Sequence, residues 1–241
     1  MQHFGLMKKT IVITGGSKGI GNSIAHKFVK KNYNIITCSR SKNNLSELTK
    51  QLKKINSKIK IYTIDVDLSI KNDCIKFCEF VKSKTRNIDV LVNNVGTYVP
   101  GKIIDEKEGN LEHMINTNLY SNYTITRGLI SIFLRQQKGH IFNICSIASK
   151  VAYGDGGSYS ISKFAFYGMS KCLRQELKEY NVKVTSILPG ATRTGSWDGT
   201  SLGDERFVNP DDISESIYSA FNTSVGGTIE EIIIRPQFGD I

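Results

Sequence analysis

Thr14-Gly15-Gly16-Ser17-Lys18-Gly19-Ile20-Gly21 is the stretch that decides the fold. It ends a short apolar run at 9–14 and opens an amphipathic segment at 20–31. Glycines between a strand and a helix let backbone N–H groups approach a phosphate at the N-terminus of that helix. An ordinary strand-to-helix turn is the alternative. We predict that this turn binds the phosphates of a dinucleotide, through Gly15, Ser17, Lys18, Gly19, Ile20 and Gly21.

Short β-branched runs alternate with amphipathic segments along the rest of the chain. The predicted strands are 9–14, 34–39, 59–64, 88–93, 139–145, 182–188 and 228–234. The predicted helices, in which apolar residues recur every three or four positions, are 20–31, 45–55, 70–84, 110–135, 158–180 and 211–221. This alternation predicts an α/β fold, a single doubly wound Rossmann domain whose seven-stranded parallel sheet carries helices on both faces.

The length and composition are those of one globular domain. The chain has 241 residues, of which 39% are hydrophobic, and it holds no apolar run near the roughly 18 residues that span a bilayer. Residues 1–6 are expected to be a leader outside the fold, with the catalytic domain at 7–241, and Met7 is an equally good start. The first residues do not resemble a signal peptide. We therefore expect a cytoplasmic protein that does not bind a membrane.

Charge and cysteine content exclude two other classes of site. The net charge is +10, but the lysines are scattered without interleaved aromatic residues, so we expect no nucleic-acid partner. The five cysteines, at 38, 74, 78, 145 and 172, form no CxxC pair and have no histidine at ligand spacing. Reduced thiols and no metal site are expected.

A second group of residues carries the chemistry that a carbonyl needs to accept a hydride. Ser146 ends a predicted strand, and Tyr159 follows thirteen residues later with Lys163 four positions further on. Residues four apart on a helix share a face, and an ammonium lowers the pKa of a nearby phenol. Ser146 can donate a hydrogen bond to the carbonyl oxygen. Tyr167 and Lys171 repeat the spacing, but lie eight residues along the helix, about 12 Å further from the strand ends.

Together these motifs resemble the short-chain dehydrogenase/reductase family. The form T-G-x-x-x-G-x-G is followed in order by Asp65-Val66, Asn93-Asn94-Val95-Gly96, Asn118, Ser146, Tyr159, Lys163 and Pro189-Gly190, so the resemblance covers 9–234. It implies a reductase in which Tyr159 is the proton donor and Lys163 makes the Tyr159 phenol more acidic. Ser146 and Tyr159 would contact the carbonyl. Asn118 would hold a water in a proton relay, although an asparagine can also interrupt a helix for packing reasons.

The same resemblance implies a cofactor site along the strand ends. Asp65 would accept from the adenine amine beside Val66, unless it caps the next helix, a role that Asp67 or Ser69 can take. The remaining positions expected to contact the cofactor are Asn94, Gly96, Tyr159, Lys163, Pro189, Gly190, Thr192 and Thr194. Val95 and Thr192 depart from the family's usual residues.

The end of the second predicted strand decides which dinucleotide is bound. An acidic residue there accepts from the ribose of NAD, whereas an arginine accommodates the 2′-phosphate of NADP. The sequence Cys38-Ser39-Arg40-Ser41 has no acid. Arg40 and Lys18 can hold the phosphate from two sides, so we predict NADP(H).

Substrate and assembly are less constrained. Residues 196–209 are expected to form a lid, and Tyr153 and Trp197 an aromatic wall of the substrate site. The tail Glu230-Glu231-Ile232-Ile233-Ile234-Arg235-Pro236 resembles that of bacterial sepiapterin-reductase-like members of the family. A 3-oxoacyl-carrier-protein reductase is the alternative. The family resemblance also implies a homodimer or homotetramer.

Two other classes of protein, a non-catalytic regulator and a methyltransferase, predict different residues at these positions. A non-catalytic regulator predicts a degraded site, but all four catalytic positions are filled here. A methyltransferase of nucleotide-binding fold needs an acidic residue after the second strand, which is missing. A small-molecule ketone or aldehyde is therefore the expected partner.

Overall fold

The computed structural model describes residues 8–241. The expected leader at 1–6 lies outside the described residues. Seven parallel strands form one sheet in the order β3-β2-β1-β4-β5-β6-β7. They are β1 (Thr10–Ile13), β2 (Asn34–Ser39), β3 (Ile61–Asp65), β4 (Val90–Asn93), β5 (His140–Ile144), β6 (Lys183–Pro189) and β7 (Glu231–Ile234). The predicted α/β fold with a single doubly wound domain is confirmed.

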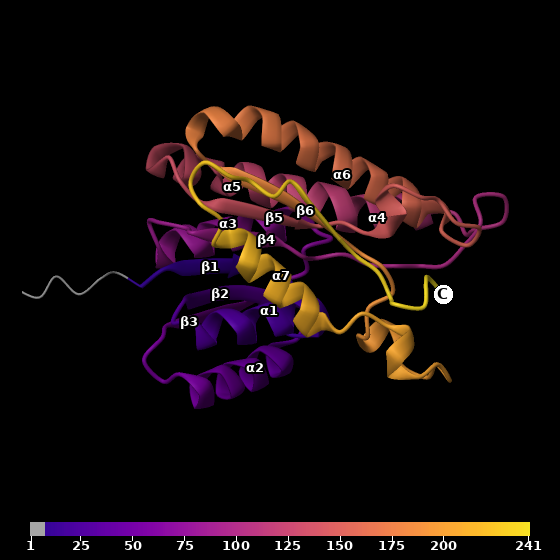
Figure 1. The fold of residues 1–241 in the computed structure, drawn as a ribbon, viewed down its shortest axis with the longest axis horizontal. Helices are drawn as coiled ribbons and strands as arrows, with labels where there is room; N and C mark the ends of the chain where they lie inside the picture. Colours follow the sequence, from indigo (N-terminus) through magenta and orange to yellow (C-terminus); the bar gives the residue numbers. More distant parts are fainter. Residues whose placement is uncertain (1–7) are drawn as a thin grey trace, which may run out of the picture.

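Helices cover both faces of the sheet because the strand residues alternate in direction. The helices are α1 (Gly19–Lys30), α2 (Lys42–Ile55), α3 (Lys71–Lys84), α4 (Asn110–Ile115), α5 (Ser121–Gln136), α6 (Gly157–Leu177) and α7 (Pro210–Phe221). In β1, Ile11 and Ile13 pack with α1, α2 and α7, whereas Val12 packs with α3 and α5. Figure 1 shows α1 and α2 on one side of the sheet and α5 and α6 on the other.

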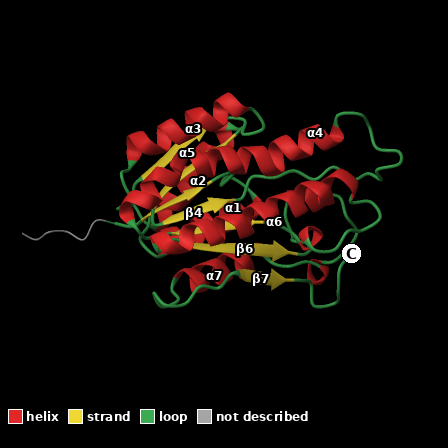
Figure 2. Cartoon of the chain, turned by 90° about the horizontal axis from the view of Figure 1, so that it is seen from above, coloured by secondary structure: helices red, strands yellow, loops and turns green. Residues whose placement is uncertain are grey.

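The sheet reverses its winding between β1 and β4, which are neighbours although β2 and β3 come between them in the chain. A ligand crevice opens at such a point, beyond the carboxyl ends of the strands. Figure 2 shows the loops gathering beyond the arrowheads of the strands, on the side where the C-terminus lies. Every predicted functional motif therefore lies at the carboxyl ends of the strands, on one side of the molecule.

One predicted helix is divided. The segment 110–135 was expected as a single helix, but a π-helical turn, Asn116–Tyr120, separates α4 from α5. The turn places Asn118 in the interior while Asn116 stays exposed. A π-turn of this kind redirects side chains and often marks a functional site.

No helix among residues 8–241 is long and apolar enough to cross a membrane.

Candidate active site

Glycines occupy the positions of the turn between β1 and α1 where a side chain would be strained or would clash. Gly15 has φ +67°, in the left-handed region. A Cβ on Gly21 would lie 2.4 Å from the carbonyl oxygen of Gly15. Among the described residues no side chain caps the N-terminus of α1 at Lys18. The first backbone N–H groups of α1 therefore have no side-chain acceptor, an arrangement that can bind an anion.

Hydroxyl and amide groups hold this turn in shape. Thr14 Oγ1 accepts from the backbone N–H of Asn94 at 2.9 Å and of Val95 at 3.0 Å. The Asn94 side chain donates to the carbonyls of Thr14 at 2.9 Å and Gly15 at 3.1 Å. Thr37 Oγ1 on β2 accepts from Gly16 N–H at 3.1 Å. No role for Thr14 or Thr37 could be predicted from the sequence, because their partners are distant in the chain: Asn94 and Val95 follow β4, and Gly16 lies in the turn before α1.

The end of β2 is polar and carries a positive charge. Ser17 Oγ donates to Ser39 Oγ at 2.8 Å, which ties the glycine turn to the end of β2. Lys18 and Arg40 are exposed on either side of this contact. Asp65 is also exposed, at the last position of β3, in register with Ser39. This edge of the structure can hold a 2′-phosphate through Arg40 and Lys18.

The prediction that Asp67 or Ser69 caps the helix after β3 is wrong, because the N-cap of α3 is Ile70 and no side chain caps it. Asp67 instead closes a turn that precedes the helix. Its carboxylate accepts from the backbone N–H of Ser69 at 3.0 Å and from the Ser69 hydroxyl at 2.8 Å. Asp65 is therefore not needed for that turn. Val66 is buried beside it, where a flat ring can pack.

The predicted catalytic side chains converge beyond β5. Ser146 lies two residues beyond the end of β5, and its Oγ accepts from Ala148 N–H at 3.1 Å. Tyr159 lies in the first turn of α6, and Lys163 lies one turn further along. The Lys163 amine donates to the carbonyl of Ile144 at 3.0 Å and lies 5.8 Å from the centre of the Tyr159 ring. The ring of Tyr98 packs edge-on against Tyr159 at 4.9 Å.

The pKa of Tyr159 shifts in the direction opposite to the one predicted from the sequence. Burial raises the pKa of Tyr159, and the Ser146 side chain opposes that shift. Burial also lowers the pKa of the Lys163 amine to about 8. From the sequence we predict that the ammonium lowers the tyrosine pKa. In the structure desolvation of the buried phenol is the largest cause of the shift, and it raises the pKa.

Asn118 is positioned by the π-turn and by α6. Its side chain accepts from Thr97 N–H at 2.7 Å and donates to the Ser162 hydroxyl at 2.8 Å. A Cβ placed on Gly96 would lie 3.2 Å from Asn118 Oδ1 and 3.4 Å from Lys163 Nζ. Asn118 and Lys163 therefore approach the same point, and Gly96 leaves that point open.

A cleft of about 640 Å³ connects most of the predicted site residues. Its lining includes Ile20, Arg40, Asn94, Gly96, Ser146, Tyr153, Tyr159, Lys163, Pro189, Gly190, Thr192, Thr194 and Trp197. Gly15, Ser17, Lys18, Gly19, Gly21, Asp65, Val66 and Asn118 lie outside that lining. The first five of these belong to the glycine turn and the start of α1. Asp65 and Val66 lie at the end of β3, and Asn118 lies next to Gly96.

Several lining residues were not predicted from the sequence, among them Tyr98, Asp240 and Ile241. Tyr98 comes from the loop after β4, and Asp240 and Ile241 come from the tail after β7. Tyr98 lies two residues after the Asn93–Gly96 motif and Asp240 four residues after the segment 230–236, but no local signal places either side chain at the cleft. Trp197 lines the cleft as predicted and packs against Phe207 at 5.1 Å between ring centres, within the expected lid at 196–209.

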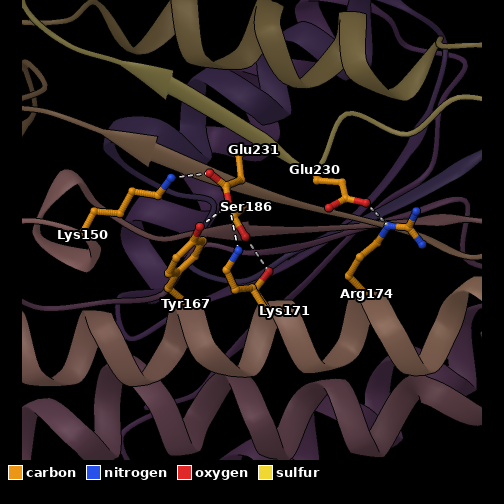
Figure 3. Close-up of polar contacts among 8 residues, drawn as sticks. Lys150, Tyr167, Lys171, Arg174, Ser186, Glu230 and Glu231 are labelled. Carbon is orange, nitrogen blue, oxygen red and sulfur yellow. Dashed lines mark hydrogen bonds and ion pairs between the residues drawn. The ribbon is translucent and has the colours of Figure 1, made fainter.

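The second Tyr-x-x-x-Lys pair lies away from this cleft. Tyr167 and Lys171 both contact the carboxylate of Glu231 at the start of β7 (Figure 3). Neither residue lines the cleft described above. As their distance along the helix predicts, Tyr167 and Lys171 lie away from the cleft, whereas Tyr159 and Lys163 line it.

Comparison with known proteins agrees with this fold and site. The model of the short chain dehydrogenase family matches residues 9–203. The chain is 31% identical over 245 residues to sepiapterin reductase from Chlorobaculum tepidum, covering 98% of this chain and 99% of that protein. The chain therefore belongs to the short-chain dehydrogenase/reductase family, and it is an oxidoreductase.

Solved structures show the same architecture over nearly the whole chain. A metagenomic short-chain oxidoreductase in complex with NADP is 26% identical, with a TM-score of 0.82 and coverage of 95% of this chain and 97% of that one. A β-ketoacyl-carrier-protein reductase from Bacteroides thetaiotaomicron is 27% identical, with a TM-score of 0.83 and coverage of 96% and 98%.

Proposed function

We propose that this protein reduces a ketone or aldehyde to an alcohol with NADPH. The observation that carries the proposal is the convergence of Ser146, Tyr159 and Lys163 on one cleft whose far end reaches Arg40. NADPH supplies the hydride when it is bound, while the protein supplies geometry and electrostatics. The alternative of a non-catalytic regulator leaves this convergence without a purpose.

The residues present fit NADP(H). A Cβ at Gly21 would clash with the carbonyl oxygen of Gly15, so only glycine lets the turn pack this closely against α1, whose first N–H groups are offered to the pyrophosphate. Arg40 and Lys18 offer a fork and a point charge to a 2′-phosphate. No carboxylate at positions 39 to 41 competes for the ribose. The metagenomic relative with bound NADP supports the same cofactor.

The side chains around the carbonyl have separate roles in this proposal. Tyr159 gives its proton to the carbonyl oxygen, and Ser146 donates a hydrogen bond to that oxygen as negative charge develops. The raised pKa of Tyr159 keeps the phenol protonated until the more basic alkoxide oxygen forms and takes the proton. Lys163, with a pKa of about 8, can return a proton to Tyr159. Asn118 would order a water beside Lys163 at the point that Gly96 leaves open.

The shape of the cleft favours a flat, ring-shaped carbonyl compound. Tyr98, Tyr153 and Trp197 line it. Asp240 is the one carboxylate among the described lining residues, and it offers an acceptor to ring N–H groups. Sepiapterin is a pterin with a ketone on its side chain, and the relative from Chlorobaculum tepidum bears its name. We therefore propose a sepiapterin-like substrate.

A screen of NADPH oxidation tests this proposal. Sepiapterin, an acetoacetyl thioester, a steroid, a sugar and a quinone would each be offered at equal concentration. We expect the highest kcat/KM with sepiapterin, because the thioester has no ring to stack on the aromatic wall. A higher kcat/KM with the thioester would transfer the assignment to the 3-oxoacyl-carrier-protein reductases. Oxidation with none of them would contradict the proposed function.

We further propose a homodimer or homotetramer in the cytoplasm. Several large apolar side chains on α4 to α6 are exposed in the single chain, among them Leu111, Tyr123, Ile161 and Phe164. Apolar patches of this kind commonly mark an interface. Light scattering is expected to give two or four times the mass of the chain, and Phe164→Glu is expected to lower that mass. A wild-type monomer would contradict the proposal.

A further inference from the structure

The carboxylate of Glu231 is bound by three side chains that come from two other parts of the chain. Lys150 and Tyr167 contact it directly, and Lys171 Nζ lies 3.1 Å from its Oε1. Figure 3 shows Glu231 on β7, with Tyr167 and Lys171 on α6 and Lys150 reaching it from the opposite side. These hydrogen bonds and cations lower the pKa of Glu231 to about 2. The carboxylate is therefore ionised at any pH used for an assay.

The three partners of Glu231 belong to, or directly follow, elements that carry catalytic groups. Lys150 follows the short helical turn Ile147–Ser149, whose N-cap is Ser146. Tyr167 and Lys171 lie on α6, the helix that begins beside Tyr159. Glu231 thus joins β7 to the Ser146 turn and to the catalytic helix at the same time. The function described above assigns no role to this cluster.

β7 leads directly into the tail that lines the cleft. Gly190 N–H donates to the carbonyl of Ile234 at 2.8 Å, and a Cβ on Gly190 would lie 2.8 Å from Pro236. Arg235 pairs with Asp240, which turns the tail back on itself. Asp240 and Ile241 then form part of the cleft wall. Tyr153 lines the same cleft.

β7 is a short strand with limited contacts. It has four residues, lies at the edge of the sheet and pairs with β6 alone. Its side chains are half-buried or exposed, so apolar packing holds it less firmly than the central strands. An ionised carboxylate with three donors is the strongest polar contact of this strand, because charge-assisted hydrogen bonds are about twice as strong as neutral ones.

We propose that Glu231 is a positioning residue, a latch that holds β7 and the tail 235–241 against α6 and the Ser146 turn. The latch fixes the tail wall of the substrate cleft. Its loss frees that wall while Ser146, Tyr159 and Lys163 remain in place, since each of these has other contacts. This inference rests on the proposed function for the identity of the cleft, but not for the latch itself.

Hydrogen exchange of Glu231→Gln tests the latch without any substrate. The neutral amide keeps the shape of the side chain but loses the charge. We expect exchange in residues 231–241 to rise roughly tenfold or more, the scale of one charge-assisted hydrogen bond. The matched control is Glu230→Gln, which removes the Glu230–Arg174 pair between the same strand and the same helix. Unchanged exchange in Glu231→Gln, or an equal rise in Glu230→Gln, would overturn the proposal.

Steady-state values of kcat and KM distinguish a role in positioning the wall of the cleft from a general loss of folded structure. With the carbonyl compound that gives the highest rate in the screen, Glu231→Gln is expected to raise KM about tenfold or more and to keep kcat within about twofold. Glu231→Asp is expected to recover part of the KM, because the charge returns on a shorter side chain. A fall in kcat with KM unchanged would overturn the wall role. If the screen finds no carbonyl substrate, the proposed function fails, and the exchange result still decides the latch.

Discussion

Tyr159→Phe is expected to lower kcat by about 10²–10⁴-fold, the usual contribution of a positioned general acid. The phenylalanine ring keeps the packing against Tyr98, so the cleft retains its shape. The variant loses the phenol that gives a proton to the carbonyl oxygen. NADPH binding, measured by fluorescence titration, is expected to stay within about threefold, since the change spares the glycine turn and Arg40.

Tyr180→Phe is the matched control for this experiment. It removes an exposed phenol just beyond the end of α6, away from the cleft, and is expected to keep kcat. Tyr167 gives the sharper contrast, because it begins the second Tyr-x-x-x-Lys pair of the same helix. If Tyr167→Phe abolished turnover and Tyr159→Phe did not, the assignment of the proton donor would be wrong.

Arg40→Glu is expected to reverse the cofactor preference. The substitution removes the guanidinium that forks onto a 2′-phosphate and brings in a carboxylate that repels it. The same carboxylate can accept from the ribose hydroxyls of NADH. We expect the ratio of kcat/KM for NADPH over NADH to fall by about 10²-fold or more, the combined scale of a lost charge-assisted contact and a new repulsion.

Two further variants show whether position or mere charge causes this change. Lys50→Glu alters the net charge by the same amount on an exposed part of α2 and is expected to keep the preference. Lys18→Ala is expected to weaken NADPH binding without improving NADH, because it removes a point charge and adds no acceptor. An unchanged preference in Arg40→Glu would remove the assignment of NADP(H).

Much of the fold was predictable because each element has a local pattern. The β-branched runs at 34–39 and 139–145 match β2 and β5 closely, since apolar runs between turns are a short-range signal. The division of segment 110–135 was not predictable. The π-turn depends on where Asn118 finds partners, and Thr97 and Ser162 are 21 and 44 residues away in sequence.

The site shows the same difference between local and long-range information. Tyr159, Lys163 and the glycine turn carry motifs, so the sequence could name them. Tyr98 and Asp240 reach the cleft through the fold alone. The direction of the Tyr159 pKa shift was predicted wrongly, because it depends on burial, and burial follows from packing. The partner of the second Tyr-x-x-x-Lys pair, Glu231, likewise needed the placement of β7 beside α6.

The most direct test of carbonyl reduction follows the hydride itself. NADPH with deuterium at its transferable position would be incubated with the protein and the carbonyl compound that the screen selects. Mass spectrometry of the alcohol is expected to show one deuterium on the former carbonyl carbon, formed in equal amount to the NADP⁺ produced. An alcohol without that label, or NADPH oxidation without alcohol, would contradict the account.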